Sequence, residues 1–393
     1  MLRQQFLQHV AQTSDTPLML EIVKAAGVYL YDKYDKQYLD LISGIGVSCL
    51  GHCHPEVVAA IKEQADKYLH TLVYGEYVLQ PQVALATKLV STLPPTLNSV
   101  YFVNSGAEAT EGAMKLAKRY TSRPEIIACR NAYHGSTQGA VSLISDQYFT
   151  QAFRPLLPAI RHIEYNDESD LQYITTQTAA VIIETVQAEW GVRTPVGDYL
   201  KSLRQRCTAV GALLIVDEIQ VGYGRTGTLW AFEQYGIVPD VLLLAKGMGG
   251  GMPIGAFIAD KTIMQVLTNN PVLGHITTFG GHPVSCAAAL ATLQVLLEQP
   301  ELIQSVPQKA ALFRQLLVHP SIQELRQAGL LMAIALGSFE KVQRVIRECL
   351  SQGLITDWFL FNSKSLRIAP PLTISEEEIR WACAVILAAL DKC

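Results

Sequence analysis

Residues 212–217, Ala-Leu-Leu-Ile-Val-Asp, and residues 241–246, Val-Leu-Leu-Leu-Ala-Lys, are two short apolar runs that each end in a charged residue. Unbroken apolar runs of this length are typical of strands in a parallel sheet with both faces covered, because neither face then needs polar side chains. Further runs of this kind, separated by helix-like stretches, lie at residues 99–104, 126–129, 180–184 and 254–259. The sequence therefore predicts an α/β fold built on a large, mainly parallel sheet covered by helices.

The C-terminal third of the chain has a different character. Helical patterns dominate there, with two short strand candidates at residues 330–336 and 365–368. A last helix is predicted after Ser375, whose hydroxyl can cap it, and the three glutamates that follow suit the positive end of the helix dipole. We expect an N-terminal segment that joins the small domain, a large α/β domain and a smaller α+β domain, at residues 1–54, 55–285 and 286–393.

Composition narrows the class of protein. Of the 393 residues, 49% are hydrophobic and 17% are charged, which excludes a disordered chain. The 31 Lys and Arg residues against 35 Asp and Glu residues leave no basic surplus, so no nucleic-acid partner is expected. No run approaches the roughly 20 apolar residues that cross a membrane, and the first residues lack the apolar core of a signal peptide. The eight cysteines are mostly scattered singly, as in a protein with reduced thiols, so the sequence predicts a cytoplasmic enzyme.

One cluster has the residue types of a metal site. Cys49, His52, Cys53 and His54 lie close together in the sequence. Their spacing is not that of a zinc site and no second pair with matching spacing follows, so no metal is expected.

Two charged residues at predicted strand ends carry the first indication of chemistry. In open α/β sheets ligands bind at the carboxyl ends of the strands, which is where Asp217 and Lys246 lie. A lysine with apolar neighbours can act as an amine nucleophile, although a lysine in such a place often only extends into water. A carboxylate there can stabilise a protonated ring nitrogen, or it can cap a helix. Together the two residues indicate pyridoxal phosphate, whose aldehyde condenses with a lysine.

Such a cofactor also needs sites for its phosphate and its ring. Residues 104–107, Asn-Ser-Gly-Ala, lie between a strand and a helix, where backbone N–H groups can bind an anion. Tyr133 or His134 could cover a ring face, or either could be an ordinary core residue. Arg367, in Arg-Ile-Ala-Pro-Pro, could hold a carboxylate with two hydrogen bonds or form a surface ion pair.

With these residues in place, the sequence resembles the class III, or ω-type, aminotransferases, which use pyridoxal phosphate and have the fold-type I architecture. The nearest similarity is to their acetylornithine and ornithine aminotransferase branch, and it covers almost the whole chain. Its most specific parts are residues 216–227, Val-Asp-Glu-Ile-Gln-Val-Gly-Tyr-Gly-Arg-Thr-Gly, and residues 246–251, Lys-Gly-Met-Gly-Gly-Gly. The resemblance implies a homodimer that moves an amino group from an ω-amine or an N-acylated diamino acid to a keto acid. Alternatives are an aminomutase, decarboxylase or racemase of the same fold, and a non-catalytic cofactor-binding regulator.

The resemblance also implies a role for each matching residue. Lys246 is expected to hold the cofactor and move the proton, and Asp217 to keep the ring nitrogen protonated. Cofactor contacts are implied for Ser105, Gly106, Ala107, Tyr133, His134, Glu184, Ile219 and Gln220. Thr278 is expected to reach the phosphate of the neighbouring subunit. Arg367 is expected to grip a substrate carboxylate, and Glu189 to mask that arginine for one of the two substrates.

Two substrate positions depart from the ornithine-type pattern. Ser136 stands where those enzymes carry an arginine that grips the distal carboxylate of 2-oxoglutarate, and Ile45 stands where ornithine aminotransferase uses a tyrosine. Loss of the arginine removes a charge-assisted pair usually worth about 1.5 to 3 kcal/mol. These changes argue against ornithine and against ordinary use of 2-oxoglutarate, and they leave the donor and the acceptor open. Arg193 is a candidate for the missing cation.

Overall fold

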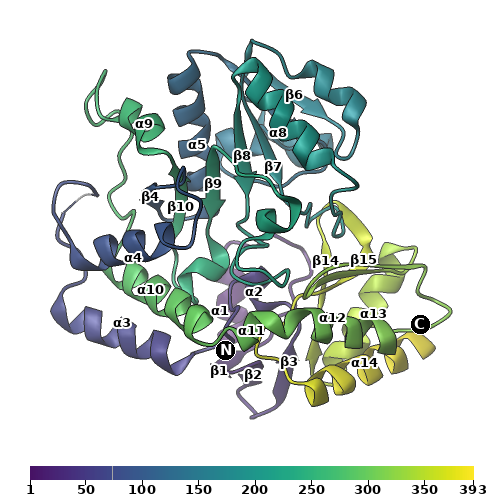
Figure 1. Cartoon of the computed structure of the whole chain (residues 1–393). Coiled ribbons are helices and arrows are strands. Elements are labelled where there is room, and N and C mark those ends of the chain that lie inside the picture. Colours follow the sequence, from purple (N-terminus) through teal and green to yellow (C-terminus); the bar gives the residue numbers. More distant parts are fainter. Residues whose placement is uncertain (73) are drawn as a thin grey trace.

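The computed structural model describes residues 1–72 and 74–393, and a seven-stranded sheet forms its centre (Figure 1). The strand order is β4-β10-β9-β8-β7-β5-β6, and the five strands from β9 to β6 run parallel. β10 is antiparallel to both of its neighbours, β4 and β9. The strands are β4 (Ser99–Val103), β5 (Glu125–Cys129), β6 (Ile160–Ile163), β7 (Thr178–Glu184), β8 (Leu213–Asp217), β9 (Val241–Leu244) and β10 (Gly255–Ala259). The predicted α/β fold with a mainly parallel sheet is confirmed.

Alternate residues of the central strands enter two separate cores. In β8, Leu213 and Ile215 pack in one apolar cluster with Ala113 of α5, whereas Leu214 and Val216 pack in another with α8. The two helices are α5 (Gly106–Thr121) and α8 (Tyr199–Val210). Because both faces are covered, β8 needs no polar residue until its last position, Asp217.

Two smaller sheets complete the molecule. The N-terminal sheet has the order β1-β2-β3-β13, and the C-terminal sheet has the order β11-β12-β15-β14. Their strands are β1 (Ile22–Ala26), β2 (Tyr29–Asp32), β3 (Gln37–Asp40), β13 (Leu354–Ile355), β11 (Glu324–Ala328), β12 (Leu331–Ala335), β14 (Asp357–Phe359) and β15 (Asn362–Ile368). The parallel pair of β3 and β13 joins the N-terminal segment to the C-terminal part of the chain.

Helices pack around these sheets. They include α3 (Pro55–Lys67), α4 (Gln80–Val90), α10 (Pro283–Glu298), α12 (Val306–Leu316), α13 (Phe339–Ser351) and α14 (Glu376–Asp391). Ser375 caps α14 by accepting the N–H of Glu378, as its position before three glutamates predicts. The division into domains stays a prediction, and its boundary at residues 285 and 286 would fall in the first turn of α10, which packs on α3 and α4.

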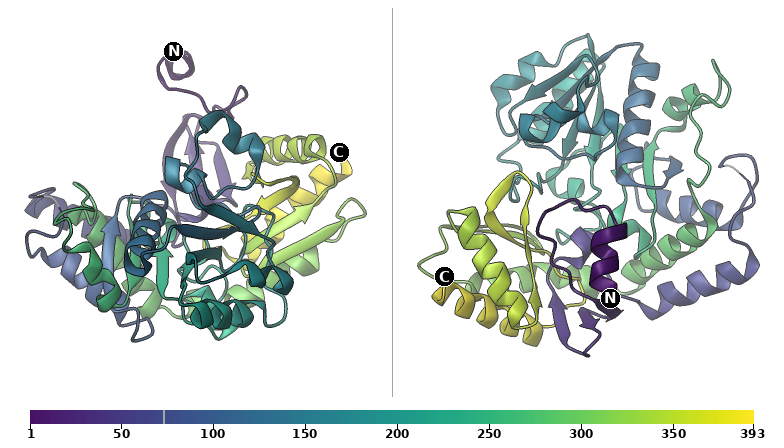
Figure 2. Two further views of the ribbon diagram at one scale, coloured as in Figure 1. Left: turned by 90° about the horizontal axis from the view of Figure 1, so that it is seen from above. Right: turned by 180° about the vertical axis from the view of Figure 1, so that it is seen from behind.

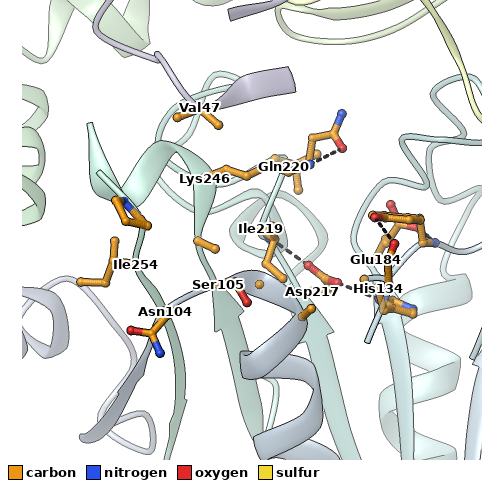
Figure 3. Close-up of a pocket in the computed structure, with 18 of the residues that line it drawn as sticks. Val47, Asn104, Ser105, His134, Glu184, Asp217, Ile219, Gln220, Lys246 and Ile254 are labelled. Carbon is orange, nitrogen blue, oxygen red and sulfur yellow. Dashed lines mark hydrogen bonds and ion pairs between the residues drawn. The ribbon is translucent and has the colours of Figure 1, made fainter. Parts of the chain in front are cut away.

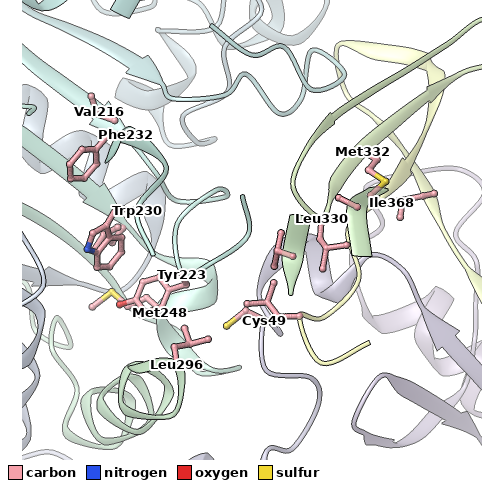
Figure 4. Close-up of a cluster of buried hydrophobic side chains, with 14 of the residues drawn as sticks. Cys49, Val216, Tyr223, Trp230, Phe232, Met248, Leu296, Leu330, Met332 and Ile368 are labelled. Atoms are coloured by element: carbon pink, nitrogen blue, oxygen red, sulfur yellow. The ribbon is translucent and has the colours of Figure 1, made fainter. Parts of the chain in front are cut away.

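The N-terminal helix packs on little else, whereas one continuous core joins the large sheet to the C-terminal sheet. Helix α1 (Leu2–His9) has no buried residue, and the left view of Figure 2 shows it standing away from the rest of the chain. Figure 4 shows Tyr223, Trp230 and Met248, which follow strands of the large sheet, in one cluster with Met332 of β12 and Cys49. This core holds the C-terminal sheet against the loops that follow β8 and β9.

Among the described helices, none has the length and apolar character of a membrane span.

Candidate active site

The carboxyl ends of β8 and β9 bring Asp217 and Lys246 to one cavity of about 730 Å³ (Figure 3). Lys246 follows β9 directly and begins a short helical turn with φ of +46°. The predicted site residues in the cavity lining are Ser105, Gly106, Ala107, Tyr133, His134, Ser136, Glu184, Asp217, Ile219, Gln220 and Lys246. The sheet therefore gathers at one edge side chains from segments more than a hundred residues apart.

Lys246 has few polar partners. Its Nζ donates a hydrogen bond to Oε1 of Gln220 at 3.0 Å, and Figure 3 shows the lysine pointing toward this residue. Burial lowers the pKa of Lys246, and this outweighs the opposite effect of the carboxylates of Glu189 and Asp217. A lysine with a lowered pKa is more often neutral, which is the form that attacks an aldehyde.

Asp217 is fixed by two hydrogen bonds at the floor of the cavity. Its Oδ1 accepts the N–H of Ile219 at 2.9 Å, and its Oδ2 lies 2.7 Å from Nδ1 of the buried His134. Burial acts to lower the pKa of His134, but the hydrogen bond to Asp217 prevails and the net shift is upward. A protonated His134 would leave Asp217 an ionised carboxylate with one lone-pair direction free for a cationic ring nitrogen. Because Nδ1 of His134 pairs with Asp217, Tyr133 stays the predicted stacking candidate of the two.

The turn after β4 supplies backbone donors. Ser105 caps α5, its Oγ accepting the N–H of Glu108 at 3.2 Å. A side chain at Gly106 would place its Cβ 2.8 Å from Cδ1 of Ile219, so a larger residue here would push the side chain of Ile219 aside. The start of a 16-residue helix next to Gly106 and Ala107 is a place where a phosphate binds well.

Glu184, the last residue of β7, accepts hydrogen bonds from the backbone of two loops. Its Oε1 accepts the N–H of Tyr133 and its Oε2 accepts the N–H of Ala188, both at 3.0 Å. Burial raises the pKa of Glu184 to about 7. The carboxyl group thus positions the segment that carries Tyr133 and the loop that carries Glu189.

Arg367 and Glu189 form a buried, two-pronged ion pair beside the cavity. The Nη1–Oε1 distance is 2.9 Å and the Nη2–Oε2 distance is 2.8 Å. Burial raises the pKa of Glu189, but Arg367 prevails and holds that pKa below its ordinary value. The resemblance implied this pair, and the structure places its two members in contact. Neither lines the cavity, but both are near enough to shift the pKa of Lys246.

Besides Glu189 and Arg367, three residues considered from the sequence lie outside the described cavity lining. Ile45 sits in the short helix α2 (Ser43–Gly46), Thr278 is exposed, and Arg193 stacks on the ring of Trp190 at 5.2 Å. Arg193 therefore does not replace the missing arginine in this cavity. Ser136 does line it, with its Oγ 3.0 Å from the hydroxyl of Tyr133.

Several residues at the site carried no signal in the sequence. Apolar side chains complete the cavity wall, namely Val47, Val186, Val221, Met252 and Ile254. Their loops reach the cavity through tertiary packing, which one sequence does not reveal. Asp357 also carried no signal in the sequence. Its Oδ1 lies 3.1 Å from Nε of Arg367.

Known proteins of one family match the chain along most of its length. The family model described as aminotransferase class-III matches residues 10–390. An acetylornithine aminotransferase of Methanopyrus kandleri is 39% identical over 387 residues, which cover 97% of this chain and 96% of that protein. A putrescine aminotransferase of Pectobacterium atrosepticum is 41% identical over 381 residues, covering 91% and 78% of the two chains.

Solved structures agree with the sequence relatives. The ornithine aminotransferase of Toxoplasma gondii superposes with a TM-score of 0.92 at 30% identity, over 100% of this chain and 94% of the other. An adenosylmethionine-8-amino-7-oxononanoate aminotransferase of Methanocaldococcus jannaschii gives a TM-score of 0.91 at 27% identity, over 100% and 99% of the two chains. The chain therefore belongs to the class III aminotransferases and is a pyridoxal-phosphate-dependent transaminase of fold type I.

Proposed function

We propose that this transaminase takes the amino group of an ω-amine or an N-acylated diamino acid and passes it to a keto acid. The observation that carries the proposal is the cover that Glu189 forms over Arg367 beside Lys246. A covered arginine lets the site accept a donor without a carboxylate at its reacting end, and an uncovered one binds the carboxylate of a keto acid. The acetylornithine and putrescine aminotransferases among the relatives agree with such donors.

The residues present fit the cofactor. Nε2 of His134 and Nε2 of Gln220 are buried polar atoms without a protein partner, as expected at the wall of a polar ligand site. Lys246 would hold the cofactor covalently, Asp217 would face its ring nitrogen, and the turn at residues 105–107 would bind its phosphate. When bound, pyridoxal phosphate supplies a ring that takes up the electrons left behind when the substrate carbon loses a proton.

The chain's own residues then direct the proton and the substrate. Lys246, with its lowered pKa, would take the proton from the substrate carbon and deliver it to the cofactor carbon within the same half-reaction. In the second half-reaction it would move a proton in the reverse direction. Asp217 would balance the positive charge of the ring nitrogen, and Tyr133 and Ile219 would orient the ring. Glu189 and Arg367 select which substrate is held.

The wild-type enzyme loaded with pyridoxal phosphate tests this function. We expect putrescine or N-acetylornithine to change the absorbance of the bound cofactor, and an added keto acid to restore it while its amino-acid product accumulates. Product formed without any keto acid would instead indicate a mutase, decarboxylase or racemase. If no amine changes the spectrum, the proposed function is wrong.

Ser136→Arg restores the arginine that ornithine-type enzymes carry at this position and so tests what its absence does. The variant is expected to raise kcat/KM for 2-oxoglutarate by about tenfold relative to pyruvate, since one charge-assisted hydrogen bond to a carboxylate is worth roughly that factor. Ser136→Gln is the control, because it adds length without charge. Steady-state rates with one fixed donor give the ratio, and an equal ratio in both variants would show that position 136 does not face the acceptor.

We also propose a homodimer in which Thr278 reaches the neighbouring site. Thr278 is exposed in a segment rich in exposed apolar residues. Large apolar side chains are exposed in this segment and in the one before α4, namely Val272, Ile276 and Phe279, and Leu69, Tyr77 and Val78. Exposed apolar patches of this kind mark interfaces. Light scattering of the loaded enzyme gives its mass, and a monomer would refute this part of the proposal.

A cytoplasmic location belongs to the proposal too. It is supported by the eight cysteines, which are all free in the structure. A fractionation experiment that finds the enzyme outside the cytoplasm would contradict it.

A further inference from the structure

Asp357 lies directly across the C-terminal sheet from Arg367. The two residues are Cα partners in the antiparallel pair of β14 and β15, and Oδ1 of Asp357 lies 3.1 Å from Nε of Arg367. The guanidinium also donates to the carbonyl oxygen of Trp358 and stacks on the ring of Phe359, 4.4 Å from its centroid. Figure 1 shows this strand pair reaching toward the large sheet. Two carboxylates therefore share one arginine.

The two carboxylates differ in how firmly the fold holds them. Glu189 lies in the loop after β7, outside any strand, and contacts the guanidinium through its side chain and the β14–β15 turn through Leu360 and Phe361. Asp357 belongs to a strand whose register with β15 is fixed by the sheet. A residue on a loop has more freedom to move than a residue whose place is set by strand pairing, and an incoming carboxylate can replace the bonds that Glu189 gives to Arg367. When a substrate carboxylate displaces Glu189, Asp357 stays.

We propose that Asp357 is a specificity-determining residue that disfavours substrates with a carboxylate next to the reacting carbon. After Glu189 leaves, the substrate carboxylate meets a guanidinium whose charge is still balanced by Asp357. A donor without that carboxylate leaves Arg367 paired with both Glu189 and Asp357. The inference deepens the proposed function and rests on Arg367 as the residue that holds the substrate carboxylate.

The place of Arg367 decides which carboxylate is meant. Glu189, which covers the guanidinium, follows Val186 of the cavity wall, and Phe361 of the β14–β15 turn packs near Tyr133, with ring centroids 6.5 Å apart. The guanidinium therefore lies beside the cavity that holds Lys246, near the reacting end of the substrate. Ser136, not an arginine, stands at the position implied to hold the distal carboxylate. Asp357 therefore acts on the carboxylate at the amino-bearing carbon.

Other charges around Asp357 bear on its protonation. Arg367 faces it from β15, Glu189 from the loop after β7, and Asp40 from β3, where Asp40 pairs with His52 at 2.8 Å. Burial raises the pKa of Asp357 to about 7, against the opposing effect of Arg367. Asp357 thus takes up a proton as the pH falls through neutrality, and its hold on Arg367 then weakens.

Asp357→Asn in the loaded enzyme tests the proposal with a matched pair of donors. Glutamate and 4-aminobutanoate differ only in the carboxylate on the reacting carbon. In single-turnover reactions at pH 8, where Asp357 is mostly ionised, the absorbance of the bound cofactor follows the rate. The variant is expected to raise the glutamate to 4-aminobutanoate rate ratio by about tenfold, because a full charge a few ångströms away is worth about that much. Glutarate, which cannot react, is expected to shift the spectrum of the variant at about tenfold lower concentration than that of the wild type.

Glu324→Gln is the control, since it removes a carboxylate that pairs with Arg326 on the same sheet. It is expected to leave the ratio unchanged. In the wild type the ratio should rise as the pH falls from 8 to 6, and in Asp357→Asn this slope should vanish. An unchanged ratio, or an unchanged slope, in an Asp357→Asn enzyme that still reacts with 4-aminobutanoate would overturn the inference. If the wild type transfers amino groups from no donor, it is the proposed function that fails instead.

Discussion

Lys246→Ala is expected to lower kcat/KM for amino transfer by at least about 10⁴-fold, because one change removes both the covalent anchor and the group that moves the proton. The only side-chain hydrogen bond of Lys246 in the described structure goes to Gln220, so the fold has little to lose. We expect a folded protein whose cofactor shows free-aldehyde absorbance and is lost on gel filtration. Steady-state rates, the spectrum and the melting temperature are the measurements.

Lys261→Ala is the matched control for this prediction. Lys261 begins the short helix α9 (Lys261–Met264) and is exposed, so the substitution removes the same charge outside the cavity. Its rate should stay within about twofold of the wild type, as for most surface changes. A small primary amine added to Lys246→Ala should restore part of the rate, since it can carry the proton that the lysine no longer moves. Turnover by Lys246→Ala above a tenth of the wild-type rate would remove Lys246 from the mechanism.

The large sheet could be predicted because most of its strands contain an unbroken apolar run. A strand such as β8, buried on both faces, leaves an unbroken run in the sequence, and the charged residue that ends it marks the ligand edge. The edge strand β6 was missed because its Arg161 and His162 interrupt the apolar run. β1 and β2 of the N-terminal sheet were missed as well, because strands that are at most half buried carry no long apolar run.

At the candidate site, too, some features could be predicted from the sequence and others could not. Lys246 and Asp217 could be found because strand ends place them, and the resemblance supplied the residues with no local signal of their own. The contacts that set their chemistry could not be found from one sequence. The pairing of His134 with Asp217, the loop-fastening role of Glu184 and the cross-strand contact of Asp357 all join residues far apart in the chain.

Asp217→Asn carries the second large expected effect, a loss of about 10²- to 10³-fold in kcat/KM. Asparagine keeps the size of the side chain but cannot balance a positive ring nitrogen, so the ring no longer takes up electrons readily. Glu184→Gln is the comparison, because Glu184 ends the neighbouring strand and is a Cα partner of Asp217 in the sheet. Its bonds go to backbone N–H groups, one of which a glutamine oxygen still satisfies, so we expect less than about a tenfold loss. Equal losses in the two variants would mean that Asp217 acts only by holding the loops.

The pH dependence of stability distinguishes the charge of Asp217 from its shape. The hydrogen bond from Asp217 raises the pKa of the buried His134 above its ordinary value of 6.5, so the folded protein binds this proton more tightly than the unfolded chain does. The resulting stability is fully present below pH 6.5 and is lost as the pH rises through the raised pKa of His134. Asp217→Asn removes the cause of that shift. The melting temperature of the wild type should therefore exceed that of the variant most at pH 6, and the gap should narrow toward pH 9. A gap that stays constant across this range would show that the Asp217–His134 contact contributes packing but no charge, and the assignment of Asp217 to the ring nitrogen would lose its electrostatic basis.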